Sequence, residues 1–146
     1  MSVSAISAGI ALAALLALGP GCASGLAGGA RAPAAAPGAA AGIEVTAVRV
    51  SAAGRVVDFR YRVVDPGKAR EVLSRQTEVY AIDQATGVRL PVPRAGKVGA
   101  LRQSASQAVA GKVYFVLFGN TGGVVKPGSL VTVVLGGVRI ADLPVE

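Results

Sequence analysis

The stretch Gly54-Arg-Val-Val-Asp-Phe-Arg-Tyr-Arg-Val-Val-Asp-Pro66 decides the fold of this chain. Its side chains alternate with a period of two: Val57, Phe59, Tyr61 and Val63 are apolar, and Asp58, Arg60 and Arg62 are charged. Only an extended strand places these two sets on opposite faces, so we expect one face in the core and the other toward solvent. On the charged face, Asp58 is expected to offset its arginine neighbours across or along the sheet.

Further strands are predicted on both sides of this stretch. The segment 43–51 is a first strand, and its alternation changes phase, which predicts a bulge near Ala47. Pro91 cannot donate a backbone hydrogen bond, so the strand 88–92 is expected at a sheet edge. The segment 112–118 is apolar on both faces, which predicts a central strand covered on each side.

Short-range signals mark the connections between these strands. Asp65 can cap a helix and Pro66 suits its first position, so one short helix is expected up to Leu73. Pro127 and Gly128 suit the middle of a type II turn. Turn signals recur roughly every 8–12 residues, which favours a single immunoglobulin-like antiparallel β-sandwich of about seven strands over a barrel.

The N-terminal residues differ in composition from this domain. Residues 1–21 contain an apolar run followed by small residues, the pattern of an export signal. Cys22 follows directly and is the candidate lipidation site; the alternative is a free cysteine within a discarded signal peptide. Residues 22–42 are rich in Ala, Gly and Pro, so we expect a low-complexity tether or disordered tail before the domain at 43–146.

The formal charge of +7 is unevenly distributed along the 146 residues. No acidic residue lies between Asp83 and Asp142, an interval that contains several lysines and arginines. Within it, residues 93–111 form the longest irregular stretch, and loops of that length are usually functional or disordered. The candidate residues for binding an anionic partner are Arg94, Lys97, Arg102 and Gln103. The alternative interpretation is a solvated basic surface that aids solubility.

The residue inventory argues against several kinds of chemistry. The chain has no histidine and one cysteine, so no metal site and no metal cofactor are expected. Ser104 and Ser106 lie in the long loop, but only Lys97 or Lys112 could serve as a base, so no catalytic residue is assigned. No glycine-rich nucleotide loop is present and the leader directs the domain out of the cytoplasm, so no nucleic-acid partner is expected.

Several phrases in the domain resemble a family when taken together. They are Asp58-Phe-Arg-Tyr-Arg-Val-Val-Asp-Pro66, Ile82-Asp-Gln-Ala-Thr-Gly87, Lys97-Val-Gly-Ala-Leu-Arg-Gln103, Tyr114-Phe-Val-Leu-Phe-Gly-Asn120 and Val125-Lys-Pro-Gly128. The chain resembles a group of uncharacterised bacterial exported or lipoprotein-like proteins with one small β-domain. The resemblance covers roughly residues 43–146. It implies an envelope location and a sandwich-like domain, and it assigns no catalytic residue.

We therefore expect an exported, membrane-tethered, non-catalytic binding or structural module of the bacterial cell envelope. In this interpretation the basic loop docks an anionic envelope component or protein, and Cys22 supplies the membrane anchor. One alternative is an assembly protein that pairs with an envelope partner through exposed edge strands. An enzyme of unknown class is a further, weaker alternative.

Overall fold

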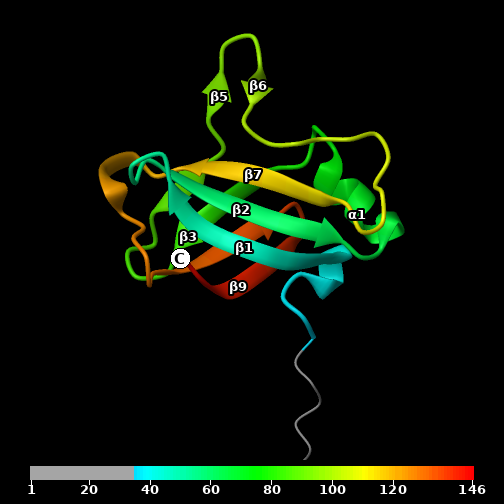
Figure 1. The fold of residues 1–146 in the computed structure, drawn as a ribbon, viewed down its shortest axis with the longest axis horizontal. Helices are drawn as coiled ribbons and strands as arrows, with labels where there is room; N and C mark the ends of the chain where they lie inside the picture. Colours follow the sequence, from blue (N-terminus) through cyan, green and yellow to red (C-terminus); the bar gives the residue numbers. More distant parts are fainter. Residues whose placement is uncertain (1–34) are drawn as a thin grey trace, which may run out of the picture. The chain divides into compact units, whose positions relative to one another are not determined.

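The computed structural model describes residues 35–146, and these form two antiparallel sheets packed face to face (Figure 1). The targeting segment, Cys22 and the tether up to residue 34 lie outside the described residues. The first sheet has the order β1-β2-β7, from strands Ile43–Ser51, Val56–Val63 and Val113–Gly119. The second has the order β4-β3-β8-β9, from strands Arg89–Pro91, Val79–Asp83, Leu130–Leu135 and Val138–Pro144. A two-stranded hairpin, β5 (Arg94–Ala95) and β6 (Gly99–Ala100), stands apart from both.

This order is an immunoglobulin-like arrangement of seven sandwich strands, as the sequence predicts. The first, second and fifth strands in chain order make one sheet. The third, sixth and seventh make the other, and the fourth pairs beside the third. The only α-helix of the described residues, α1 (Pro66–Leu73), crosses from the first sheet to the second. Two 3-10 turns, η1 (Ala39–Ala41) and η2 (Thr121–Gly123), complete the fold.

Strand β2 is the centre of the first sheet and behaves as its sequence predicts. It pairs with β1 on one side and β7 on the other, and the β1 register shifts between Val45 and Ala47, where the bulge is expected. Phe59 and Tyr61 are 0% exposed. The alternation of its side chains therefore determines which face of the sheet enters the core.

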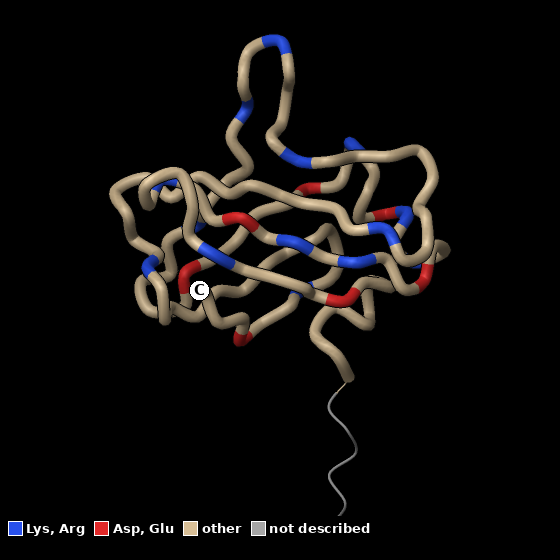
Figure 2. The backbone as a smooth tube through the Cα atoms, in the orientation of Figure 1, with Lys and Arg blue, Asp and Glu red and all other residues tan. Residues whose placement is uncertain are grey.

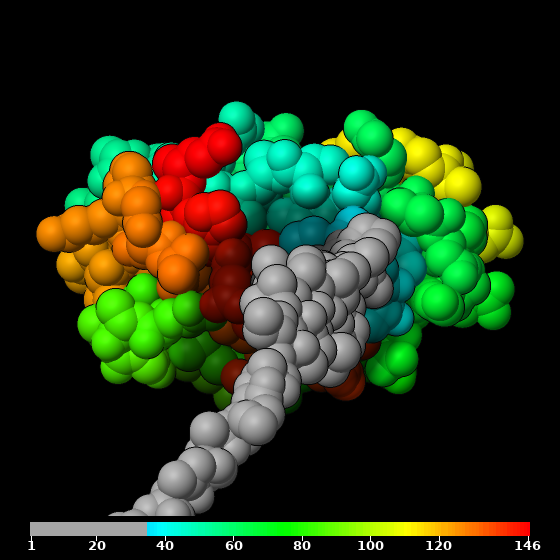
Figure 3. All heavy atoms as spheres, turned by 90° about the horizontal axis from the view of Figure 1, so that it is seen from below, coloured from blue at the N-terminus to red at the C-terminus, as the bar shows by residue number. Residues whose placement is uncertain are grey.

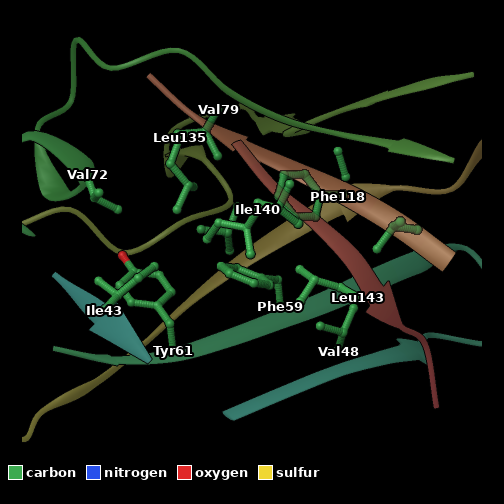
Figure 4. Packing of buried hydrophobic residues seen from close by; sticks show 14 of the residues in the cluster. Ile43, Val48, Phe59, Tyr61, Val72, Val79, Phe118, Leu135, Ile140 and Leu143 are labelled. Atoms are coloured by element: carbon green, nitrogen blue, oxygen red, sulfur yellow. The ribbon is translucent and has the colours of Figure 1, made fainter. Parts of the chain in front are cut away.

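The core lies between the inner faces of the two sheets (Figure 4). Three aromatic pairs lie on the inner face of the first sheet: Phe59 with Tyr61 along β2 at 5.6 Å between ring centroids, and Phe59 with Phe118 (6.2 Å) and Tyr61 with Tyr114 (6.0 Å) between β2 and β7. Branched aliphatic side chains of β8 and β9, among them Ile140, meet these rings from the opposite sheet. Burial of such large side chains is the main stabilising contribution in a domain of this size.

Helix α1 closes one end of the core. The Asp65 side chain accepts hydrogen bonds from the backbone N–H groups of Gly67 (2.9 Å) and Lys68 (3.3 Å), and Pro66 occupies the first helical position. The buried side chains of Val72 and Leu73 face the core. The predicted cap and helix are confirmed.

The charged face of β2 differs from the expectation in one respect. Asp58 accepts from Arg49 across the sheet (3.3 Å) and from Arg60 along the strand (3.0 Å), which confirms the predicted ion pairs. However, Asp58 is only 5% exposed, because the two arginines lie over it. The carboxylate is thus covered by its partners, although it points away from the core.

Strand β7 was predicted as a central strand, and the structure corrects this. In the order β1-β2-β7 it lies at the margin of its sheet, and β2 is central. Its outer edge is occupied by a returning loop: the Leu117 N–H donates to the Leu101 carbonyl (2.9 Å), and the Gln103 N–H donates to the Phe115 carbonyl (3.0 Å). Of the apolar side chains on the outer face, Phe115 and Leu117 are half-buried and Val113 is exposed, and the neighbour at this edge is a loop rather than a further strand.

Two further edges, those of β1 and β4, are protected in other ways. The free edge of β1 bonds with the C-terminal residue, since Val50 N–H donates to Glu146 O (2.9 Å) and Glu146 N–H donates to Val48 O (2.8 Å). In Figure 3 these C-terminal residues lie on the surface between β1 and the segment after β7. Strand β4 is at the edge of the second sheet and contains Pro91, as predicted. Such features hinder pairing with another chain.

One connection follows the predictions, and the N-terminal boundary of the domain departs from them. The Ser129 N–H donates to the Lys126 carbonyl (2.9 Å), and Gly128 has a φ of 90°, as a type II turn requires. At the N-terminal boundary, η1 packs against the sandwich, with Ala41 buried and the Gly42 carbonyl accepting from the N–H groups of Val64 and Asp65. The folded part thus includes the last residues of the stretch expected to be tether.

None of the helices within residues 35–146 is long and apolar enough to cross a membrane. The same residues contain no cluster of three or more side chains of the kinds that bind metal ions.

Candidate anion-binding site

The loop predicted to be functional forms a projecting hairpin and then returns along β7 (Figure 1). Strands β5 and β6 pair through residues 94–95 and 99–100, and the Leu101 N–H donates to the Pro93 carbonyl (2.9 Å) at the base. Val98 near the tip is 81% exposed. Lys and Arg positions lie on the hairpin and at its base, and no acidic position lies on it (Figure 2).

Arg102 is held at the base of this hairpin and points toward the interior. It forms an isolated antiparallel bridge with Val116, whose side chain is buried, so the two side chains lie on the same face. Its Nη2 donates to the Ser74 carbonyl at 2.7 Å. Its Nη1 is buried and has no hydrogen-bond partner among residues 35–146.

The surroundings of Arg102 disfavour its charge, although arginine remains protonated in proteins. Burial lowers the pKa of its guanidinium, and the nearby Tyr61 hydroxyl opposes that shift. Burial raises the pKa of the Tyr61 hydroxyl, because for tyrosine the charged form is the deprotonated one. Both the Tyr61 and Tyr114 hydroxyls are buried without a partner in the described part of the chain. The guanidinium charge of Arg102 is thus held partly desolvated at a fixed place, where it attracts an anion.

Three arginines converge on one hollow of about 270 Å³ beside the hairpin. Arg75, Arg94 and Arg102 line it together with Ser104, and residues 98–100 of the hairpin form one wall. No acidic side chain of the described residues lines the hollow. The three arginines form no ion pair within residues 35–146, whereas Arg49, Arg60, Arg62 and Arg89 each do. We name this hollow the arginine pocket.

A second hollow of about 660 Å³ adjoins the arginine pocket and shares Arg75 and Ser104 with it. Its remaining lining residues are Arg70, Ser74, Ala105, Ser106 and Gln107. Hydroxyl, amide and guanidinium groups therefore contribute much of its wall. No aromatic and no acidic side chain of residues 35–146 lines it. We name this second hollow the serine groove.

Backbone contacts explain why these distant segments meet. The Ala105 N–H donates to the Leu73 carbonyl at the end of α1 (3.1 Å), and Arg102 bonds the next carbonyl, that of Ser74. Arg75 follows directly and its Nε donates to the Ser104 Oγ (3.3 Å). The returning loop is thus joined to the end of the helix, which brings Arg75 beside the hairpin.

The four predicted site residues have three different placements in the structure. Arg94 and Arg102 line the arginine pocket. Lys97 lies in the turn between β5 and β6 and lines neither hollow, so it projects at the tip. Gln103 belongs to the scaffold, because its Oε1 accepts from the Phe115 N–H of β7 (3.2 Å).

Sequence reasoning missed Arg75, Arg70 and Ser104 as members of a binding site. The two arginines lie within and just after α1, close to Glu71 and Glu78, so no one-signed interval marks them. Ser104 was considered only as a nucleophile. In the structure its hydroxyl is bonded to Arg75, a group that cannot accept a proton, and Lys97 does not line the hollow. The arrangement is therefore suited to holding an oxyanion through several donors.

Comparisons of the chain with protein-family models, with curated proteins and with solved structures gave no match.

Proposed function

We propose that this chain is an exported, membrane-tethered, non-catalytic binding module of the bacterial cell envelope that docks an anionic partner at the arginine pocket. The N-terminal export pattern and Cys22 support the location. The observation that supports the binding activity is the convergence of Arg75, Arg94 and Arg102 on one acid-free hollow among the described residues.

Physical reasons favour a ligand at this pocket over a merely soluble surface. Exposed arginines that serve only solubility have no need to converge, and like charges placed together repel. Here one of the three, Arg102, is partly desolvated and keeps a buried donor without a partner inside residues 35–146. An oxyanion in the hollow would offset the mutual repulsion of the three guanidinium groups by interacting with several of them at once.

The edge-strand alternative receives less support. The free edge of β1 is covered by the C-terminal residue, the outer edge of β7 by residues 101–103, and β4 contains Pro91. Strand addition needs a row of free backbone groups, and each of these edges offers few.

The test is an NMR titration of the full chain with inorganic phosphate, following the amide signals of Arg102 and Ser104. We expect saturable shifts at these residues, and Arg94→Ala should weaken the affinity about tenfold through loss of a charge-assisted hydrogen bond. Arg139→Ala is the matched control, because Arg139 is an exposed arginine on β9 that forms no ion pair within the described residues.

The dependence on salt provides a second criterion. Affinity should fall when ionic strength rises from low salt to about 0.5 M, because screening weakens contacts between exposed charges. Unchanged affinity, or equal effects of Arg94→Ala and Arg139→Ala, would refute binding at the arginine pocket.

A further inference from the structure

The arginine pocket and the serine groove are neighbours, which suits a ligand longer than one anion. They share Arg75 and Ser104; the pocket has two further arginines, Arg94 and Arg102, and the groove has one, Arg70. A single phosphate or carboxylate would fill only one of the two hollows, whose volumes are about 270 and 660 Å³. The distribution of charge therefore suits two anionic groups.

Both anionic positions lie near the end of α1. Arg70 is in the last turn of the helix, and the carbonyl of the C-cap residue Ser74 accepts from Arg102. The two hollows share Arg75 and Ser104 in their lining, so a short spacer is sufficient to join anionic groups in them.

The wall between the arginines indicates the nature of that spacer. Ser104, Ser106 and Gln107 contribute hydroxyl and amide groups, which bond to hydroxyls. No aromatic side chain within residues 35–146 lines either hollow, so a nucleobase or a sugar ring would find no stacking surface. A flexible, hydroxyl-bearing spacer fits this lining better than a ring.

Arg70 is available for such a contact. It forms no ion pair with any described residue, and it also borders a separate hollow that contains Glu71 and Glu78. Those carboxylates do not line the serine groove. An anionic group in the groove would therefore face Arg70 and Arg75 without a lining carboxylate beside it.

We propose that the combined site binds two phosphate groups joined by a short hydroxyl-bearing spacer, the chemistry of a glycerol bridged between two phosphates. This inference deepens the proposed anion-binding function and rests on it. One phosphate lies against Arg75, Arg94 and Arg102, and the second lies against Arg70. The same chemistry occurs in the headgroup of a diphosphatidylglycerol lipid and in soluble glycerol phosphates.

The experiment is calorimetry of the full chain with glycerol 1,3-bisphosphate and, in parallel, glycerol 3-phosphate. The bisphosphate should bind at least about tenfold more tightly, because it gains further charge-assisted hydrogen bonds at Arg70. Arg70→Ala should abolish this advantage, so that the two ligands bind the variant with equal affinity. Arg94→Ala should weaken both ligands, and Arg139→Ala neither.

The outcomes separate this inference from the function on which it rests. Equal affinities for the two ligands, or an unchanged preference in Arg70→Ala, would overturn the two-phosphate site while single-anion binding stands. Failure of both ligands to bind would overturn both proposals.

A vesicle-binding assay distinguishes a lipid headgroup from a soluble glycerol phosphate as the source of the ligand. Vesicles of phosphatidylcholine with diphosphatidylglycerol are compared with vesicles of equal charge that contain phosphatidylglycerol. Tighter binding to the diphosphatidylglycerol vesicles that is lost in Arg70→Ala supports the lipid headgroup as the ligand. Binding of the soluble bisphosphate without binding to either kind of vesicle supports a free glycerol phosphate. Equal binding to both kinds of vesicle, insensitive to Arg70→Ala, counts against a lipid ligand at this site.

Discussion

Replacing Arg102 by Met is expected to abolish phosphate binding while changing the free energy of unfolding by less than about 1 kcal/mol. The bond from Nη2 to the Ser74 carbonyl, at 2.7 Å, is charge-assisted. A bond of this kind contributes about 1.5–3 kcal/mol. The opposing, destabilising contribution comes from Nη1 of Arg102, which is buried without a hydrogen-bond partner within residues 35–146. An unsatisfied buried donor costs about 1–3 kcal/mol, so the two contributions nearly cancel.

Met is the appropriate replacement because its flexible apolar side chain can follow the path of the arginine stem. The free energy of unfolding is measured by urea denaturation, and phosphate affinity by the NMR titration described above. Arg102→Lys is a useful companion, since it keeps the positive charge but loses the planar fork, and we expect intermediate affinity.

Two results would contradict this reasoning. A loss of more than about 2 kcal/mol in Arg102→Met would mean that Arg102 serves mainly to join the loop to α1, since it exceeds the difference between the opposing terms. Phosphate affinity equal to that of the unmodified protein would mean that the arginine pocket does not use its innermost guanidinium.

Four further predictions concern the fold and the anchor. Phe59→Ala should lower the free energy of unfolding by about 3–5 kcal/mol in urea denaturation, because the ring is completely buried; a loss below about 1 kcal/mol would contradict its central place in the core. Asn120→Ala should cost about 3 kcal/mol, since it removes three hydrogen bonds, two of them to the backbone of Val125; a stability equal to that of the parent protein would refute this. Stability should fall above about pH 10, because unfolded Tyr61 ionises near its ordinary pKa of 10.0 while burial raises the pKa of the folded residue. The fall in the free energy of unfolding with pH should be shallower in Tyr61→Phe, as measured by denaturation at several pH values. An identical pH dependence in the two proteins would exclude Tyr61 as its cause. Mass spectrometry should find an acylated N-terminus that Cys22→Ala lacks, with the variant moving from the membrane to the soluble fraction; an unmodified cysteine would exclude the anchor.

Local patterns made much of the sandwich predictable. The alternation in β2 predicted which of its faces is buried, and the phase change near Ala47 predicted the bulge. Asp65 and Pro66 predicted the start of α1. These features depend on side-chain periodicity and on backbone preferences of neighbouring residues, so they can be read without knowledge of distant contacts.

The position of β7 could not be predicted in the same way. Its outer apolar residues, such as Leu117, indicate only that both faces are covered. They do not distinguish a neighbouring strand from a returning loop such as 101–103. Likewise, Asp58 is buried because two arginines lie over it, and one of them comes from another strand. Such burial depends on strand register rather than on local sequence.

The sequence by itself determined the strand pattern, the helix start and the basic, acid-free character of residues 93–111. Only the tertiary structure decided which basic residues act together. Arg75 reaches Arg94 and Arg102 because the loop is bonded to the end of α1, and Gln103 is used by β7 instead. Charge along a chain sums over neighbours in sequence, whereas a binding site depends on proximity in space, and backbone pairing between distant segments creates that proximity.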